Sequence, residues 1–156
     1  MQKIVPCLWV EKDAGAVAEF YAGIFKDAKV KSVQNNQKGP GGEFSTAAME
    51  LFGQEFQILA AGLLFKFTEA VSFVINCDDQ TEIDYYYAKL STVPGTEQCG
   101  WLKDKFGLSW QIVPTVLSRF LSDPDWERVA RVNAVLYQMK KLNLAALERA
   151  YTGGDV

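Results

Sequence analysis

The sequence predicts an α+β fold in which one small βαβββ unit is used twice and is followed by a C-terminal helical extension. Residues 52–59, Phe-Gly-Gln-Glu-Phe-Gln-Ile-Leu, return as residues 106–113, Phe-Gly-Leu-Ser-Trp-Gln-Ile-Val, with four of the eight positions identical. A stripe of apolar residues at helical spacing also occurs twice. The second stripe lies 66 residues after the first, position by position: Val17, Phe20, Tyr21 and Ile24, then Ile83, Tyr86, Tyr87 and Leu90. Repetition at a domain-like spacing indicates two copies of one structural unit.

We assign the first unit to residues 2–62, in the order strand, helix and three strands. The apolar, β-rich run 4–10 predicts a strand. The buried stripe predicts a helix over 13–25, with Asp13 as its N-cap. We then expect a strand over 29–34, a Gly/Pro-rich loop over 35–42, and a hairpin of 43–52 with 54–60 that turns at Gly53.

The second unit, residues 68–114, repeats this order. Residues 71–77 predict a strand, 79–91 a helix, and 98–103 with 108–113 the closing hairpin. The offset between the copies falls from 66 at the helix to 54 at the hairpin, so the first unit holds 12 more residues. We place these extra residues in the Gly/Pro-rich loop.

Residues 115–151 form the predicted helical tail. We expect a short helix over 114–121 and a longer one that opens at Asp123-Pro124 and runs to about Leu142, since proline is favoured at the first helical position. Asn143 is expected to cap a last turn or two that ends at Tyr151. The tail is expected to cover a sheet or a partner subunit, and residues 1–151 are assigned to a single domain.

Composition narrows the class of protein. A net charge of −3 and a pI near 5.0 argue against nucleic-acid binding. No apolar run approaches the roughly 20 residues that cross a bilayer, so no membrane partner is expected. The amino terminus does not resemble an export signal. Three cysteines without zinc-like spacing favour reduced thiols, and we expect a cytoplasmic location.

The chain contains no histidine. Histidine is the commonest metal ligand and the commonest general base near neutral pH. Its absence excludes Ser-His-Asp, Cys-His and His-metal chemistry within this chain.

Several of these features resemble the vicinal oxygen chelate superfamily, which includes glyoxalase I, fosfomycin-resistance proteins and extradiol dioxygenases. They are the paired units, the Phe20-Tyr21 pair late in the first helix and the closing Gly-x-x-x-Gln turn. Residues 100–114, Gly-Trp-Leu-Lys-Asp-Lys-Phe-Gly-Leu-Ser-Trp-Gln-Ile-Val-Pro, resemble the signature of its PhnB-like family, often labelled "3-demethylubiquinone-9 3-methyltransferase". The resemblance implies glyoxalase-like half-barrels that enclose a pocket, which in relatives usually holds a divalent metal.

The resemblance also implies where metal ligands would stand in this chain. The first-strand positions fall on Pro6 and near Ala70, and the last-strand positions fall on Gln57 and Gln111. Proline and alanine offer no donor, and an amide oxygen is a weak ligand beside imidazole or carboxylate. We therefore expect no metal. No Gly-x-Gly-x-x-Gly pattern opens a helix after a strand, so we expect no cofactor of that kind either.

Strand alternation and the resemblance together name the candidate pocket. Side chains in phase with Gln111 and Gln57 share one face of their strands. The family pattern adds residues on the neighbouring and first strands. The predicted ligand-binding residues are Leu8, Glu55, Gln57, Cys99, Trp101, Ser109 and Gln111. Each also has a structural alternative, since Trp101 can simply fill the barrel and the glutamines can hydrogen-bond within it.

Three functions remain open from the sequence. The first is binding of a small apolar or aromatic metabolite without a metal, in a homodimer. The second is an enzyme, a lyase, isomerase or transferase, in which Glu55 acts as a base with a pKa raised by burial, or Cys99 acts as a nucleophile. The third is a protein that binds no ligand. The sequence does not decide whether the protein is an enzyme.

Overall fold

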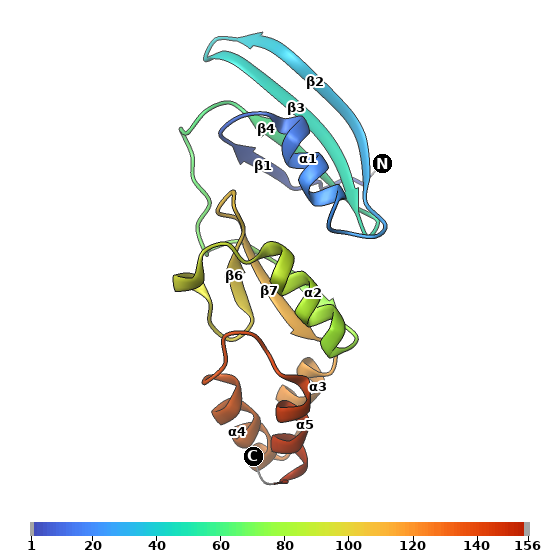
Figure 1. Ribbon diagram of the computed structural model, residues 1–156, viewed down its shortest axis with the longest axis vertical. Helices are drawn as coiled ribbons and strands as arrows, with labels where there is room; N and C mark the ends of the chain where they lie inside the picture. Colours follow the sequence, from blue (N-terminus) through green and yellow to red (C-terminus); the bar gives the residue numbers. More distant parts are fainter. Residues whose placement is uncertain (1, 155–156) are drawn as a thin grey trace. The chain divides into compact units, whose positions relative to one another are not determined.

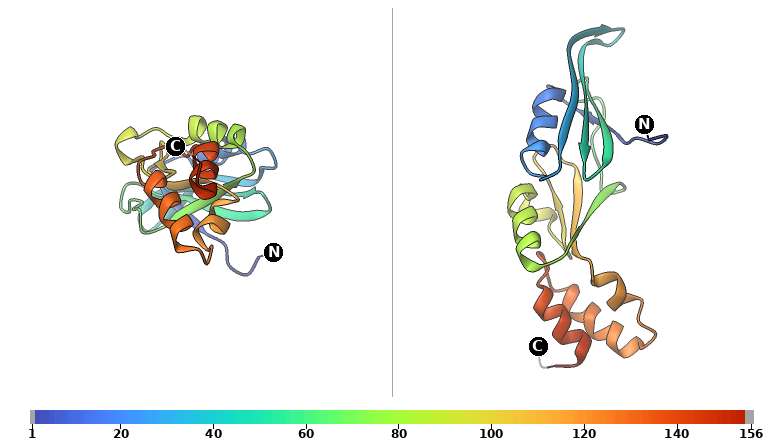
Figure 2. Two further views of the ribbon diagram at one scale, coloured as in Figure 1. Left: turned by 90° about the horizontal axis from the view of Figure 1, so that it is seen from below. Right: turned by 90° about the vertical axis from the view of Figure 1, so that its right-hand side faces the viewer.

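The computed structural model describes residues 2–154, which form two compact units, one ending at Phe67 and the next beginning at Thr68 (Figure 1). Each unit has a small open sheet with one helix against one of its faces, as the right-hand view of Figure 2 also shows. Within the described residues, no helix is both long enough and apolar enough to cross a bilayer.

The first unit has the predicted order of elements. These are β1 (Cys7–Val10), α1 (Ala14–Ala22), β2 (Lys29–Gly39), β3 (Gly42–Leu51) and β4 (Gln54–Ala60). The sheet order is β1-β4-β3-β2, with β1 parallel to β4 and the other pairs antiparallel. Asp13 caps α1 by accepting a hydrogen bond from the Ala16 amide at 2.9 Å, as expected. Phe52 and Gly53 both have positive φ, which is the backbone of a tight type I′ hairpin turn.

The predicted Gly/Pro-rich loop over 35–42 was wrong. Strand β2 continues to Gly39, which pairs directly with Gly42, so only Pro40 and Gly41 form the turn. The continuation became possible because β2 bulges between Gln34 and Gln37, where Asn36 takes a positive φ of 56° and restores the pairing with β3. The extra residues of the first unit therefore belong to the β2–β3 hairpin and not to a loop.

The second unit differs from the first in one strand. Its elements are β5 (Ser72–Cys77), α2 (Gln80–Leu90), a short 3₁₀ turn η1 (Pro94–Thr96), β6 (Trp101–Lys103) and β7 (Ser109–Pro114), in the sheet order β5-β7-β6. Within the described residues it has no counterpart of β2. Only a short segment separates α2 from β6, and its proline and glycine fold into η1. This missing strand accounts for much of the difference in length between the two copies.

The tail consists of α3 (Leu117–Leu121), α4 (Trp126–Leu136) and α5 (Leu144–Thr152). These helices share an apolar core. Its buried members are Leu117, Phe120, Val132, Leu136, Leu142, Leu147 and Ala150. Asn143 caps α5 as predicted, by accepting a hydrogen bond from the Ala146 amide.

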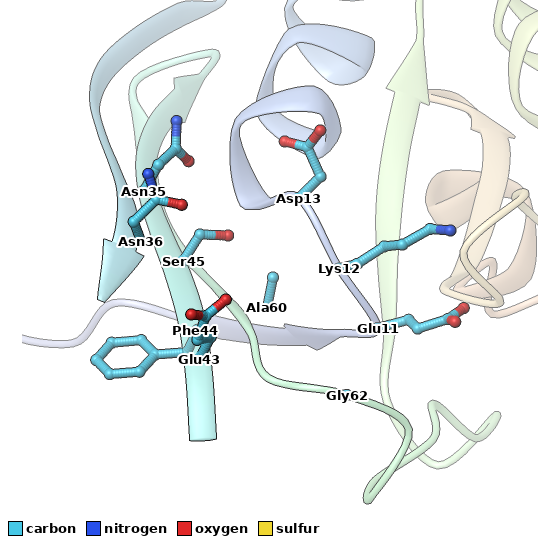
Figure 3. A pocket seen from close by; sticks show the side chains of 10 residues that line it. All are labelled: Glu11, Lys12, Asp13, Asn35, Asn36, Glu43, Phe44, Ser45, Ala60 and Gly62. Carbon is cyan, nitrogen blue, oxygen red and sulfur yellow. The ribbon is translucent and has the colours of Figure 1, made fainter. Parts of the chain in front are cut away.

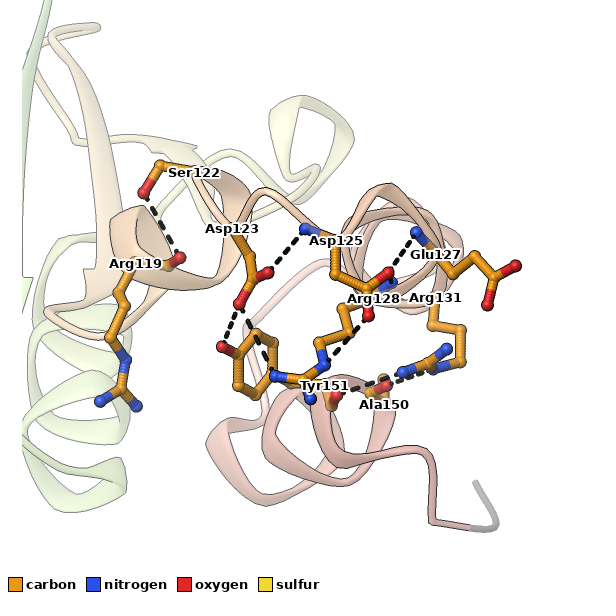
Figure 4. Close-up of polar contacts among 9 residues, drawn as sticks. All are labelled: Arg119, Ser122, Asp123, Asp125, Glu127, Arg128, Arg131, Ala150 and Tyr151. Carbon is orange, nitrogen blue, oxygen red and sulfur yellow. Dashed lines mark hydrogen bonds and ion pairs between the residues drawn. The ribbon is translucent and has the colours of Figure 1, made fainter.

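Helix α4 begins later and ends earlier than predicted. Its N-cap is Asp125, whose carboxylate accepts from the amides of Glu127 and Arg128, and its C-cap is Tyr137. Asp123, the predicted cap, instead accepts hydrogen bonds from the Asp125 amide and from the Tyr151 hydroxyl (Figure 4). This carboxylate therefore ties the start of α4 to α5.

The tail is fastened to the second unit by backbone hydrogen bonds. The amides of Cys99 and Gly100 donate to the carbonyls of Met139 and Lys140 at 2.8 and 2.7 Å. Gly100 has a φ of +85°, and a Cβ atom at this position would lie 2.7 Å from the carbonyl oxygen of Ile112. Only glycine fits here, because both the backbone conformation and the space exclude a side chain.

We expect Gly100→Ala to destabilise the protein by at least about 2 kcal/mol, since left-handed backbone costs an L-residue ~1–2 kcal/mol and the clash with Ile112 adds to it. Urea unfolding followed by tryptophan fluorescence measures the loss. Gly95→Ala is the matched control, because its Cβ would meet no atom within 4 Å. Equal stabilities of the two variants would contradict this account.

Candidate functional site

The pairing of β1 with β4 decides which side chains of the first unit line its open face. Cys7 pairs with Gln57 and Trp9 with Leu59, so these four share the face that α1 does not cover. Phe56 and Ile58 lie on the opposite face, where they are 5% and 1% exposed. Leu8 pairs with Ile58 and is buried with it, so its predicted place beside Gln57 was wrong. The true neighbour of Gln57 on β1 is Cys7, one residue after Pro6.

A cavity of about 330 Å³ lies on this open face. Strands β1 to β4 all contribute to it. It is lined by Cys7, Ser32, Gln34, Thr46, Ala47, Ala48, Gln57, Ile58 and Leu59. Most of its polar groups are neutral hydroxyls and amides, which donate and accept hydrogen bonds but carry no charge. Apolar surface from Ala48 and Leu59 completes the lining.

Glu55 stands at one end of the same face and is ion-paired. Its Oε1 atom lies 2.6 Å from the Lys31 ammonium, which also contacts Glu50 at 2.7 Å. The hydrogen bond from Lys31 lowers the pKa of the Glu55 carboxyl from its ordinary value, and the Gln2 amide adds to the effect. The raised pKa expected from the sequence was therefore wrong, because a cation outweighs the desolvation.

The second unit repeats this arrangement around Gln111. Val74 pairs with Gln111 across β5 and β7, and Trp101 pairs with it across β6 and β7, so all three share one face. The Gln111 amide donates to the Ser72 hydroxyl at 2.9 Å. Trp101 and Ser109 thus lie on the predicted face, while Trp110 and Ile112 are buried on the other.

Cys99 lies apart from this face. Its thiol contacts the carbonyl of Leu136 at 3.5 Å, and the side chain packs against the apolar core of the tail. Its backbone φ of +51° turns the chain just before β6, which breaks the alternation that the prediction relied on. Of the other thiols, burial raises the pKa of Cys77 to about 12, which keeps it protonated and unreactive.

Asp104 is a key residue of the signature region that sequence reasoning did not single out. It is fully buried, and its carboxylate accepts from the amides of Phe106 and Leu108 and from the Trp110 indole at 2.9, 3.1 and 2.8 Å. These bonds shape the turn between β6 and β7 and fix Trp110 on the helix side. An aspartate three residues before a glycine (Gly107) and six before a tryptophan (Trp110) was the available signal.

The residues of the open faces do not form a good metal site. Within residues 2–154, no group of three or more Cys, Asp or Glu side chains is placed to hold a metal ion. Gln57 and Gln111 have Cys7 and Val74 as their partners on the first strands. Partial burial raises the pKa of the Cys7 thiol, so the thiolate that a metal prefers is disfavoured. This donor set does not fit the divalent metal that the resemblance to the superfamily implies.

Another cavity, of about 420 Å³, lies where α1 begins (Figure 3). None of the predicted site residues lines it. Two of its polar side chains already serve the helix, because Asp13 accepts from the Ala16 amide and Ser45 from the Ala14 amide. We therefore interpret the polar groups of this cavity as capping the N-terminus of α1 and not as a ligand site.

The family is decided by its sequence model. The model described as "3-demethylubiquinone-9 3-methyltransferase" matches residues 2–113, which include both units and stop before the tail helices. The chain belongs to this family. Among curated proteins, none matches the chain.

Solved structures share the fold of the chain. The PhnB protein of Bacillus cereus, which carries the same methyltransferase description, is 31% identical with a TM-score of 0.60, over 72% of this chain and 99% of its own. The fosfomycin resistance protein FosX of Listeria monocytogenes is 15% identical with a TM-score of 0.56, over 78% of this chain and 98% of its own. Its mutant form was solved with Mn(II) and 1S,2S-dihydroxypropylphosphonic acid, and matches with 18% identity and a TM-score of 0.53, over 78% of this chain and 100% of its own. This member of the family therefore has the glyoxalase-like fold of the vicinal oxygen chelate superfamily.

The ion pair of Glu55 predicts a pH effect. A carboxyl whose pKa is lowered by folding contributes stability above its ordinary pKa, and loses it as the pH falls through the folded value. In Lys31→Gln we expect the pKa of Glu55 to rise toward the ordinary value, measured by ¹³C NMR titration of its carboxyl carbon. The gap in urea midpoint between wild type and Lys31→Gln should close as the pH falls. Lys38→Gln is the control. An unchanged pKa of Glu55 in Lys31→Gln would contradict the assignment of Lys31 as the group that lowers it.

Proposed function

We propose that this protein binds a small metabolite with an apolar or aromatic body on the open sheet faces of its units, without a metal. The observation that carries the proposal is the cavity of about 330 Å³ beside Gln57. Its size is within the range of about 300–1,000 Å³ of small-molecule sites. The repeated motif places a second glutamine, Gln111, on the matching face of the second unit.

The lining of the cavity favours a neutral ligand with hydrogen-bonding groups at its edge. Ser32, Gln34 and Thr46 offer donors and acceptors along one side. Leu59 gives an apolar floor, and its neighbour on β1 is Trp9, which packs edge-on against Phe65 with ring centroids 5.0 Å apart. An aromatic ring with hydroxyl or methoxy groups combines both requirements.

The enzymatic alternative has less support. The ion pair with Lys31 lowers the pKa of Glu55, which makes its carboxylate a weaker base, and Cys99 contacts the tail helices. Glu55 lines a neighbouring cavity of about 620 Å³ beside its partner Lys31, not the cavity of about 330 Å³, and Cys99 lines neither. We therefore propose binding as the function and treat the methyltransferase description as the name of the family.

Filling the cavity tests the binding proposal. Methoxyhydroquinone is the probe, and calorimetric titration measures its Kd. We expect Ala48→Leu to weaken binding by about tenfold or more, since its longer side chain occupies the space of a ring and 1.4 kcal/mol corresponds to tenfold. The matched control is Ala16→Leu on the exposed side of α1. Equal affinities of both variants, or no binding by the wild type, would contradict the proposal, and stoichiometric manganese, zinc or nickel in the purified protein would contradict its metal-free part.

We further propose that the protein is a cytosolic homodimer. Several large apolar side chains lie exposed, as at interaction surfaces. They include Leu63, Leu64, Phe65, Trp126 and Tyr137, which are 60–74% exposed. Sedimentation equilibrium measures the mass of the protein in solution. We choose concentrations of about 5–50 µM, at which a stable dimer persists. A concentration-independent monomer would contradict the dimer.

A further inference from the structure

Three polar side chains stand in a row across the open face of the second unit. Ser109 on β7 pairs with Ser72 on one side and with Lys103 on the other. Residues paired in this way point to the same face of a sheet, about 5 Å apart. The row therefore brings an ammonium group and two hydroxyls to one place.

The Lys103 side chain is mostly buried, but Glu69, the carboxylate that it pairs with, is exposed. The Lys103 side chain is 19% exposed, and its ammonium lies 2.5 Å from Oε1 of Glu69, a carboxylate that is 61% exposed. Glu69 belongs to no helix or strand. The ammonium lowers the pKa of this carboxyl, which therefore stays charged at neutral pH. An exposed group on a connecting segment is easily exchanged for another carboxylate, because solvent takes up the group that leaves.

Ser109 has hydrogen-bonding capacity that the protein does not use. The residue is 1% exposed, and its hydroxyl has no hydrogen-bond partner in the described part of the chain. A buried hydroxyl left unsatisfied is unfavourable, because the hydrogen bonds to water that it loses on burial are not replaced. A ligand atom beside Ser109 would remove this cost.

The spacing between Trp101 and Lys103 indicates the length of the ligand. It stands two residues before Lys103 on β6 and on the same face, so their Cα atoms are separated by about 6–7 Å along the strand. That distance is the span from a carboxylate to the far side of one six-membered ring. Trp101 offers the ring a flat apolar surface.

We propose that the open face of the second unit binds a small ring-bearing carboxylate, with its carboxylate on Lys103 and Ser109 and its ring on Trp101, and that Glu69 occupies Lys103 when the ligand is absent. This inference rests on the proposed function and names the chemical class for this face. A monoanionic carboxylate fits better than a phosphate, because the row holds one cation and that cation already accepts a carboxylate. The net charge of −3 also disfavours a dianion.

The test compares benzoate with benzyl alcohol, which differ in charge and share the ring. The full-length protein is titrated with each, and the indole N–H signal of Trp101, assigned with Trp101→Phe, reports binding by NMR. Wild type should bind benzoate about tenfold more tightly than benzyl alcohol, since one charged hydrogen bond contributes about 1.5–3 kcal/mol. Lys103→Gln should abolish this preference, while Lys103→Arg and the control Lys105→Gln keep it. Glu69→Gln should tighten benzoate binding several-fold, by removing the internal competitor.

The outcomes separate this inference from the proposed function. Equal Kd values for the two probes in wild type, or an unchanged preference in a folded Lys103→Gln, would overturn the carboxylate site and leave ring binding intact. Weaker benzoate binding in Glu69→Gln would overturn the role of Glu69 as the internal occupant. If neither probe shifts the Trp101 signal, both the carboxylate site and the proposed binding of ligands on this face are contradicted.

Discussion

The parallel pairing of the first and last strands in each unit is the constraint on which the rest of the structure depends. In each unit the last strand lies beside the first, Gln57 opposite Cys7 and Gln111 opposite Val74. Because side chains alternate along a strand, this register sends Phe56 and Trp110 to the helix side. The same register leaves the two glutamines on the uncovered faces. A shift by one residue would exchange core and open face at once.

Most elements could be predicted, because their signals are local. The repeated stripe located α1 and α2, and Asp13, Asp79 and Asn143 cap helices through hydrogen bonds to nearby amides. The errors arose where pairing overrides composition. Residues 35–39, predicted as part of a loop, extend β2 because β3 offers them a partner and a bulge absorbs the mismatch. The end of α4 was likewise missed, since an apolar pattern does not mark where a chain turns back.

The candidate site was predictable by face but not by contact. Alternation, with the family pattern for Trp101, predicted the sheet face on which Gln57, Trp101, Ser109 and Gln111 lie. It could not foresee that Lys31, 24 residues away, neutralises Glu55, or that a positive φ turns Cys99 toward the tail. Those outcomes depend on partners distant in sequence. The buried Asp104 was overlooked for a different reason. Its partners, two amides of its turn and the Trp110 indole, lie close in sequence, but an aspartate in a turn is ordinarily exposed.

The family model ends at residue 113, yet the tail beyond it completes the hydrogen bonding of β6. Two amides that precede this strand, those of Cys99 and Gly100, find their acceptors only in the segment between α4 and α5. A homologue whose chain stops at the second sheet must offer those amides water or another protein. The sheet edge that is sealed here would then be available for intermolecular strand or loop pairing. In this chain the tail therefore occupies the two amides that such pairing would use.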